Sequence, residues 1–232
     1  MLRTKWYCFI VGTSLLLQSG VHQVNAQQNS NRLMGIAAGM GIGLHTAPSL
    51  TDYLNTVAQP RVEQKIQEFA SLLELFIAPE LQISEEWILA IEYSHGFKSY
   101  LIDDRNGYSR SDITYRIHMP SLIVRYWTPG EGYFFEFGGG VGYHVAQLTQ
   151  TMTAFGFEDR ATATGLGFKL EAVGNTRIDK NFYGRIGLDI RWEFLGRFSR
   201  QDGSQLAAAN GTLQPTMNFY SFGLKLGVTV PF

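Results

Sequence analysis

Residues 220–232 read Tyr220-Ser221-Phe222-Gly223-Leu224-Lys225-Leu226-Gly227-Val228-Thr229-Val230-Pro231-Phe232. The even positions are all apolar or aromatic, whereas the odd positions from 221 to 229 are small or polar. A period of two indicates a β-strand with one apolar face and one polar face. This pattern fits a strand of a soluble sandwich. It also fits a strand of a membrane barrel, with lipid outside and a polar interior.

The same alternation recurs along the chain and predicts eight strands. They cover 34–45, 73–83, 87–98, 113–126, 133–145, 166–172, 182–194 and 220–232. The connections between them alternate between long (46–70, 100–112, 148–160, 197–217) and short (84–86, 128–132, 175–181). This rhythm is typical of outer-membrane barrels, which have long outer loops and tight periplasmic turns. Aromatic residues near both ends of the strands match two lipid interfaces. We therefore expect an all-β, eight-stranded antiparallel transmembrane up-and-down β-barrel.

The composition agrees with this fold and excludes some functions. The net charge of −1 indicates neither a nucleic-acid surface nor an acidic tail. The mean hydropathy of −0.06 is too low for a helical membrane protein. Barrels resemble soluble proteins in composition because half of each strand faces inward.

The first 26 residues have the features of a secretory signal peptide. Arg3 and Lys5 precede an apolar stretch from Trp6 to Leu17, which is too short to span a membrane as a helix. A small-residue cleavage site follows at 24–26, and the sole cysteine, Cys8, lies before it. We expect a cleaved signal peptide over 1–26, a short periplasmic lead over 27–33 and a barrel domain over 34–232.

Three segments carry finer expectations. The inward positions of 35–43 are all glycine except Ala37. These glycines could merely ease curvature of the strand, but we favour a packing role, in which they leave room for long side chains from across the lumen. In 113–119 we place Ile113, Tyr115, Ile117 and Met119 outward, and a bulge at Pro120 then shifts the phase. Loop 46–70 fits either a short amphipathic helix or a partly ordered loop.

The alternation predicts that charged side chains of both signs fill the lumen in equal number, six against six. The inward acids are Glu80, Glu92, Glu136, Glu171, Asp189 and Glu193, and the inward bases are Arg116, Arg125, Lys169, Arg185, Arg191 and Lys225. An eight-stranded barrel is just wide enough for its side chains to fill, and buried charges need partners. Two interpretations follow: a salt-bridged plug that holds the barrel shut, or a narrow gated path for ions or small polar solutes.

Catalysis has little support in the sequence. His118 and His144 could serve acid–base chemistry, but no nucleophile–base pattern accompanies them, and we assign both to the lumen. Phosphate-loop and metal-ligand spacings are absent from the sequence, so we expect a non-catalytic protein without a cofactor. The long loops 46–70 and 197–217 are the candidates for binding a surface partner.

The chain resembles the small outer-membrane β-barrel superfamily, which includes the OmpA transmembrane domain, OmpX and the PorT-like barrels. The resemblance covers roughly 34–232. It rests on the signal peptide, the alternating strands, the glycine-rich segment 137–143 and the segment 227–232. It implies a monomer in the lipid of the bacterial outer membrane that binds no nucleic acid. During biogenesis such a protein would interact with periplasmic chaperones and the barrel-assembly machinery. The assembly signal would be Tyr220, Phe222, Leu224, Leu226, Val228, Val230 and Phe232. The resemblance implies the activity only weakly, because members range from structural anchors to adhesins and small channels.

Overall fold

The computed structural model describes residues 34–58, 71–103, 110–152, 157–207 and 214–232. The predicted signal peptide (1–26) and periplasmic lead (27–33) lie outside these residues. Strands account for most of the described chain. They are β1 (Met34–Thr46), β2 (Leu72–Gln82), β3 (Trp87–Asp103), β4 (Arg110–Pro129), β5 (Tyr133–Met152), β6 (Phe157–Asp179), β7 (Phe182–Arg197), β8 (Ser199–Arg200) and β9 (Thr216–Pro231).

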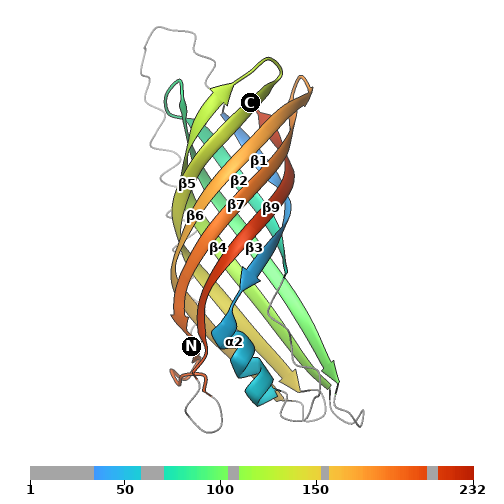
Figure 1. Ribbon diagram of the computed structural model, residues 1–232, viewed down its shortest axis with the longest axis vertical. Helices are drawn as coiled ribbons and strands as arrows, with labels where there is room; N and C mark the ends of the chain where they lie inside the picture. Colours follow the sequence, from blue (N-terminus) through green and yellow to red (C-terminus); the bar gives the residue numbers. More distant parts are fainter. Residues whose placement is uncertain (1–33, 59–70, 104–109, 153–156, 208–213) are drawn as a thin grey trace, which may run out of the picture. The chain divides into compact units, whose positions relative to one another are not determined.

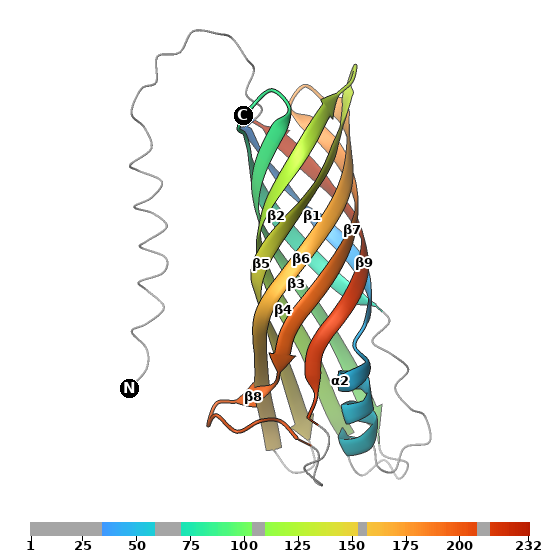
Figure 2. The same cartoon turned by 60° about the vertical axis from the view of Figure 1, so that its left-hand side comes forward.

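Eight long antiparallel strands close into a ring (Figure 1). Each pairs with its neighbours in the order β5-β4-β3-β2-β1-β9-β7-β6, and a β5–β6 ladder closes the ring. The two-residue strand β8 is an addition that pairs with β6 (Figure 2). The predicted up-and-down barrel is therefore confirmed. We call its two ends the turn end, at the top of Figure 1, and the loop end, at the bottom.

An apolar band covers the outside of the barrel. On β9, the predicted outward residues Tyr220, Phe222, Leu224, Leu226 and Val228 are all exposed. Comparable side chains of β1 to β7 continue the band around the ring. A soluble protein rarely exposes such a continuous apolar surface, whereas a bilayer requires one.

Strand β4 differs from the prediction in its phase. Its pairing with β3 and β5 keeps one register on both sides of Pro120, so the predicted bulge is absent. Ile113, Tyr115 and Ile117 are therefore buried inside the ring, and Arg116 lies exposed on its outside. The prediction failed because we assumed that alternating apolar residues must face lipid. Here the apolar residues face an apolar interior.

This interior, which we call the loop-side core, fills the ring near the loop end. It is made of Ala47, Leu50, Tyr53, Leu54, Leu72, Ile113, Tyr115, Ile117, Met119, Ala146, Leu148, Ala161, Ala163, Leu195, Phe198, Leu206, Met217 and Phe219. The barrel thus has two sections. In the lipid-facing band the outside is apolar and the inside charged. In the loop-end section the outside is polar and the inside apolar.

A short helix from loop 46–70 contributes to this core. Helix α2 (Pro48–Tyr53) and the π-helical turn η1 (Leu54–Ala58) follow β1, and Leu50 and Leu54 are fully buried. Both views place α2 at the loop end of the barrel, beside the end of β1 (Figures 1 and 2). The remainder of this loop, 59–70, lies outside the described residues. Within the described chain, neither helical segment has the length and apolarity needed to span a membrane.

Several strands run further than predicted. β5 extends to Met152 and β6 begins at Phe157, so most of the predicted loop 148–160 is strand. β3 and β4 likewise pair as far as Asp103 and Arg110. Their polar outward residues suggested loops, but the loop-side core supplies the apolar surface that keeps these extensions folded.

Candidate functional site

The charged interior of the lipid-facing band is the densest polar cluster in the described structure. Eleven of the twelve predicted residues lie buried inside the ring, and Arg116 does not. Glu74, which follows the same inward alternation but was not counted, belongs to the cluster. Seven carboxyl groups therefore face five strong bases, with His144 beside them, in place of the predicted six against six. We call this set the lumen network.

Arg125 on β4 is the hub at the turn end of the network. Its side chain is 0% exposed and its Nη1 contacts Glu80 Oε1 at 2.6 Å and Glu136 Oε2 at 3.4 Å. Its Nε donates to Glu171. Arg185 on β7 shares two of these acids, at 2.9 Å from Glu80 and 3.4 Å from Glu136. One guanidinium is thus shared among carboxylates from β2, β5 and β6, which ties distant strands together.

Two lysines meet one glutamate in the middle of the network. Glu92 Oε1 on β3 accepts hydrogen bonds from Lys169 Nζ at 2.7 Å and from Lys225 Nζ at 2.8 Å. Lys169 also contacts Glu171 Oε2 at 2.6 Å, and Lys225 contacts Glu74 Oε1 at 2.9 Å. The Lys169–Glu171 pair lies within β6, whereas the other pairs cross the lumen from β6 and β9 to β2 and β3.

The glycines of β1 make room for one of these crossings. Lys225 on β9 lies opposite Gly41, and a Cβ at Gly41 would lie 2.8 Å from the Leu224 carbonyl oxygen and 3.0 Å from Lys225 Cγ. The Lys225 side chain passes over this empty position to reach acids on β2 and β3. The predicted packing role of the glycine stripe is confirmed at this position.

Arg191 on β7 joins the network to the loop-side core. Its guanidinium contacts Glu74 Oε1 and Asp189 Oδ1, both at 2.8 Å. Its Nη1 also approaches the sulfur of Met119, a loop-side core residue, at 3.2 Å. The charged and apolar interiors therefore meet directly, side chain against side chain.

A serine, a histidine and a glutamate form a chain of hydrogen bonds at the same boundary. His144 Nδ1 lies 2.6 Å from Glu193 Oε2, and His144 Nε2 lies 3.1 Å from Ser121 Oγ. This order matches the nucleophile–base–orienting acid order of hydrolase triads. All three side chains are buried, with Glu193 1% exposed, so a substrate could not reach them in this conformation. Ser121 was not assigned from the sequence, although it shares the inward phase of Arg125.

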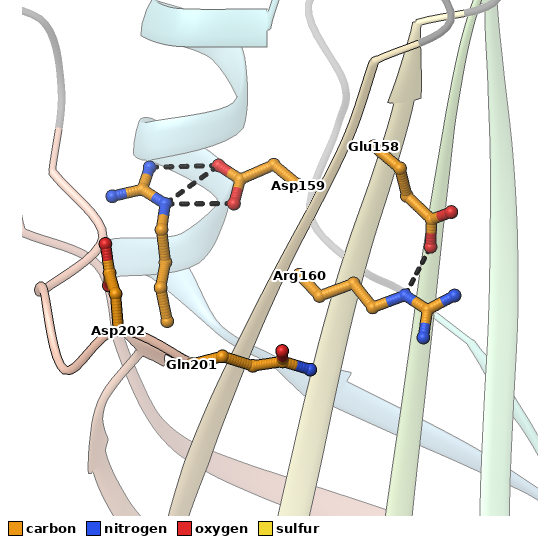
Figure 3. A pocket seen from close by; sticks show the side chains of 6 residues that line it. Glu158, Asp159, Arg160, Gln201 and Asp202 are labelled. Atoms are coloured by element: carbon orange, nitrogen blue, oxygen red, sulfur yellow. Dashed lines mark hydrogen bonds and ion pairs between the residues drawn. The ribbon is translucent and has the colours of Figure 1, made fainter. Parts of the chain in front are cut away.

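A polar groove lies outside the barrel at the loop end. Figure 3 shows its lining, and its volume is about 450 Å³. Arg200 on β8 holds Asp159 on β6 through its Nε at 2.9 Å and its Nη2 at 2.9 Å, while Arg160 pairs with Glu158. The hydrogen bond to Asp159 raises the pKa of Arg200. The remaining lining residues are Gln201 and Asp202.

A tyrosine and an aspartate near the loop end also have shifted acidities. Burial against the loop-side core raises the pKa of the Tyr53 phenol, so this side chain stays neutral. Hydrogen bonds from Ser204 lower the pKa of Asp202, which therefore stays ionised. Among the described residues, no group of three or more His, Cys, Asp or Glu side chains could hold a metal ion.

Comparisons with known proteins identify the fold. No protein-family model and no curated protein sequence matches the chain. Among solved structures, it is similar to Neisserial surface protein A, with 13% identity, a TM-score of 0.51, and coverage of 86% of this chain and 97% of that one.

Two further structures give the same result. Ail of Yersinia pestis, in complex with the heparin analogue sucrose octasulfate, has 10% identity and a TM-score of 0.51, with 88% of this chain and 100% of that chain covered. A major outer membrane protein of Thermus thermophilus has 14% identity and a TM-score of 0.51, with 86% and 99% covered. The chain therefore has the fold of small outer-membrane β-barrels.

Proposed function

We propose that this protein is an integral outer-membrane barrel with a closed lumen, and that it has a structural or surface-interaction role without catalysis. The observation that carries the proposal is that two different fillings close the lumen, one after the other along the barrel axis. The lumen network fills the inside of the ring within the lipid-facing section, and the loop-side core, with α2, fills the inside of the loop-end section. A solute would have to displace both ion pairs and apolar side chains to pass.

The outer surface of the ring supports the proposed membrane location. Its apolar band and aromatic residues suit a bilayer, and the strands leave no open edge in the band. We propose export by the signal peptide over 1–26, with its cleavage, and assembly with periplasmic chaperones and the barrel-assembly machinery. The predicted assembly residues of β9 all lie on the lipid-facing side or at its end, where such machinery could reach them.

Conductance of the refolded chain 27–232 in a planar lipid bilayer tests the closed lumen. Insertion is first verified by heat-dependent gel mobility. We expect no discrete openings from the wild-type barrel and small openings from the double variant Glu74→Ala/Leu50→Ala, which weakens both fillings. Frequent openings of the wild type would favour the runner-up function, a small gated channel for ions or small polar solutes.

The Ser121–His144–Glu193 chain requires its own test of the non-catalytic proposal. A fluorophosphonate probe labels an activated serine covalently, whereas a serine that only satisfies a buried histidine does not react. We expect no labelling of the folded barrel in vesicles. Labelling that disappears in Ser121→Ala would contradict the proposal.

The loop-end surface is the proposed interaction region. It carries polar outward residues on β3, β4, β5 and β6, and the groove of Figure 3 opens there. The complex of Ail with a polysulfated analogue invites comparison. The groove here holds three carboxylates (Glu158, Asp159 and Asp202) and two guanidinium groups (Arg160 and Arg200). This balance disfavours a polysulfated ligand, because unpaired cationic groups are what such a ligand needs.

A further inference from the structure

A group of basic and aromatic side chains lies on the outside of the barrel where the apolar band ends. We call it the rim patch: Tyr93, His95 and Phe97 on β3, and Arg116 and His118 on β4. The ladder pairs His95 directly with His118 and Phe97 directly with Arg116. All five alternate outward, so they face the lipid side of the ring.

The rim patch marks the change of chemistry along β4. Toward the turn end, the outward residues are the apolar Leu122 and Val124, which are exposed. Toward the loop end, the outward positions are His118, Arg116 and Thr114. In a membrane, this boundary is the depth at which acyl chains give way to head groups.

Contacts within the patch hold the two imidazoles in place. Tyr93 Oη lies 2.7 Å from His118 Nδ1, and the rings of His95 and His118 lie 4.6 Å apart between centroids. The tyrosine occupies one nitrogen of His118, which leaves the opposite edge of that ring for another partner. Within the described part of the chain, Arg116 forms no ion pair, and its side chain is exposed.

A hollow on the lipid-facing surface adjoins these side chains. Its volume is about 480 Å³, and Leu75, Phe76, Ile77, Tyr93, His95 and His118 line it. Leu75 and Ile77 of β2 form an apolar wall and are 47% and 48% exposed. The hollow is therefore apolar along its wall and carries two imidazoles, and Arg116 lies one outward position further along β4.

We propose that the rim patch binds a phosphate-bearing lipid of the leaflet at the loop end. One acyl chain lies in the hollow against Leu75 and Ile77, and the phosphate accepts hydrogen bonds from Arg116 and His118. A guanidinium is suited to phosphate because it presents several donors in a fixed plane. Arg116 is exposed, has no ion pair among the described residues and lies one outward position beyond an apolar hollow; this arrangement matches an amphipathic anion, and a bilayer supplies such molecules at this depth. The inference rests on the proposed membrane location.

Native mass spectrometry of the refolded barrel tests this proposal. The detergent-solubilised protein is titrated with phosphatidylglycerol, with lipid A and, as a zwitterionic reference, with phosphatidylcholine. We expect lipid A or phosphatidylglycerol to be retained in preference to phosphatidylcholine. The double variant Arg116→Gln/His118→Gln should weaken that retention at least tenfold. Arg177→Gln, which removes an exposed arginine of β6 at the turn end, outside both the rim patch and the loop-end groove, is the matched control and should bind as the wild type does.

Two results would overturn the proposal. The first is equal retention of anionic lipid by the double variant and the wild type. The second is displacement of the lipid by inorganic phosphate at the same concentration, which would show that the acyl chain contributes nothing. Heat-dependent gel mobility of the barrel after insertion into vesicles distinguishes failure of the lipid-site proposal from failure of the proposed function. A barrel that inserts but shows no patch-dependent lipid contradicts only the rim patch, whereas one that does not insert contradicts both.

Discussion

Arg125 shows why single residues matter inside this barrel. Its guanidinium is completely buried and touches three carboxylates within 3.4 Å. A buried ion pair adds little net stability, because desolvation offsets the attraction. Removing one partner is different, since it leaves the other charges buried without compensation.

We therefore predict that Arg125→Met destabilises the barrel by about 3–5 kcal/mol, because Glu80, Glu136 and Glu171 lose a shared partner. Urea unfolding in lipid vesicles, followed by gel mobility, measures the change. Arg160→Met is the control: its side chain is 65% exposed, and its pair with Glu158 is screened by water. Equal midpoints for both variants would mean that Arg125 is not a hub.

Two glycines of β1 give a second comparison at the same scale. A Cβ on Gly39 would lie 2.1 Å from the Leu226 carbonyl oxygen, whereas one on Gly43 would meet nothing within 4 Å. Gly39→Ala should cost about 1–3 kcal/mol through overpacking against the β9 backbone, and Gly43→Ala should cost nothing or stabilise slightly. The same urea assay checks this, and a smaller effect at Gly39 than at Gly43 would contradict the close approach of β1 and β9.

At the scale of elements, α2 is the part of loop 46–70 that the structure ties to the barrel. Leu50 and Leu54 are fully buried in the loop-side core, whereas Asp52 on the same helix is exposed. The helix is six residues long, so packing rather than intrinsic propensity must hold it.

We predict that Leu50→Asp undocks α2 without unfolding the barrel, because an unpaired charge cannot remain in the apolar core. Hydrogen exchange of amides 49–58 should accelerate, while exchange of the β9 ladder stays slow. Asp52→Ala should leave both rates unchanged. Slow exchange over 49–58 in Leu50→Asp would show that α2 is held by something other than this core.

The elements also show which features could be predicted from the sequence. The two faces of β7 and β9 could be predicted, because their apolar residues face lipid and their charges face inward, although both strands extend into the predicted loop 197–217. β4 could not, since an apolar interior with a polar exterior gives the same alternation as the reverse arrangement. The error moved Arg116 into the lumen and concealed the rim patch, which depends on that phase.

Pairing within the lumen network likewise lay beyond the sequence. Alternation places Lys225 and Glu92 inside, but only the ring's curvature brings β9 within reach of β3 across Gly41. The Ser121–His144–Glu193 chain also depends on strands β4, β5 and β7 meeting at one depth.

Across the whole molecule, one continuous ring encloses two interiors of different chemistry. The register of β4 is unbroken past Pro120, but the apolar side chains of the strand face lipid on one side of Pro120 and the interior on the other. A lumen closed by charges in one section and by apolar side chains in the next follows from this reversal of the two faces.

Cysteine labelling along β4 tests which of its side chains face the interior at the loop end. The expected mature chain contains no cysteine, because Cys8 lies in the signal peptide. Single variants Arg116→Cys and Ile117→Cys are refolded into vesicles and treated with a water-soluble maleimide. We predict rapid labelling at position 116 and protection at 117, with Leu122→Cys reached only by a lipid-soluble probe. Protection at 116 with labelling at 117 would place a phase shift at Pro120 and contradict the apolar loop-side core.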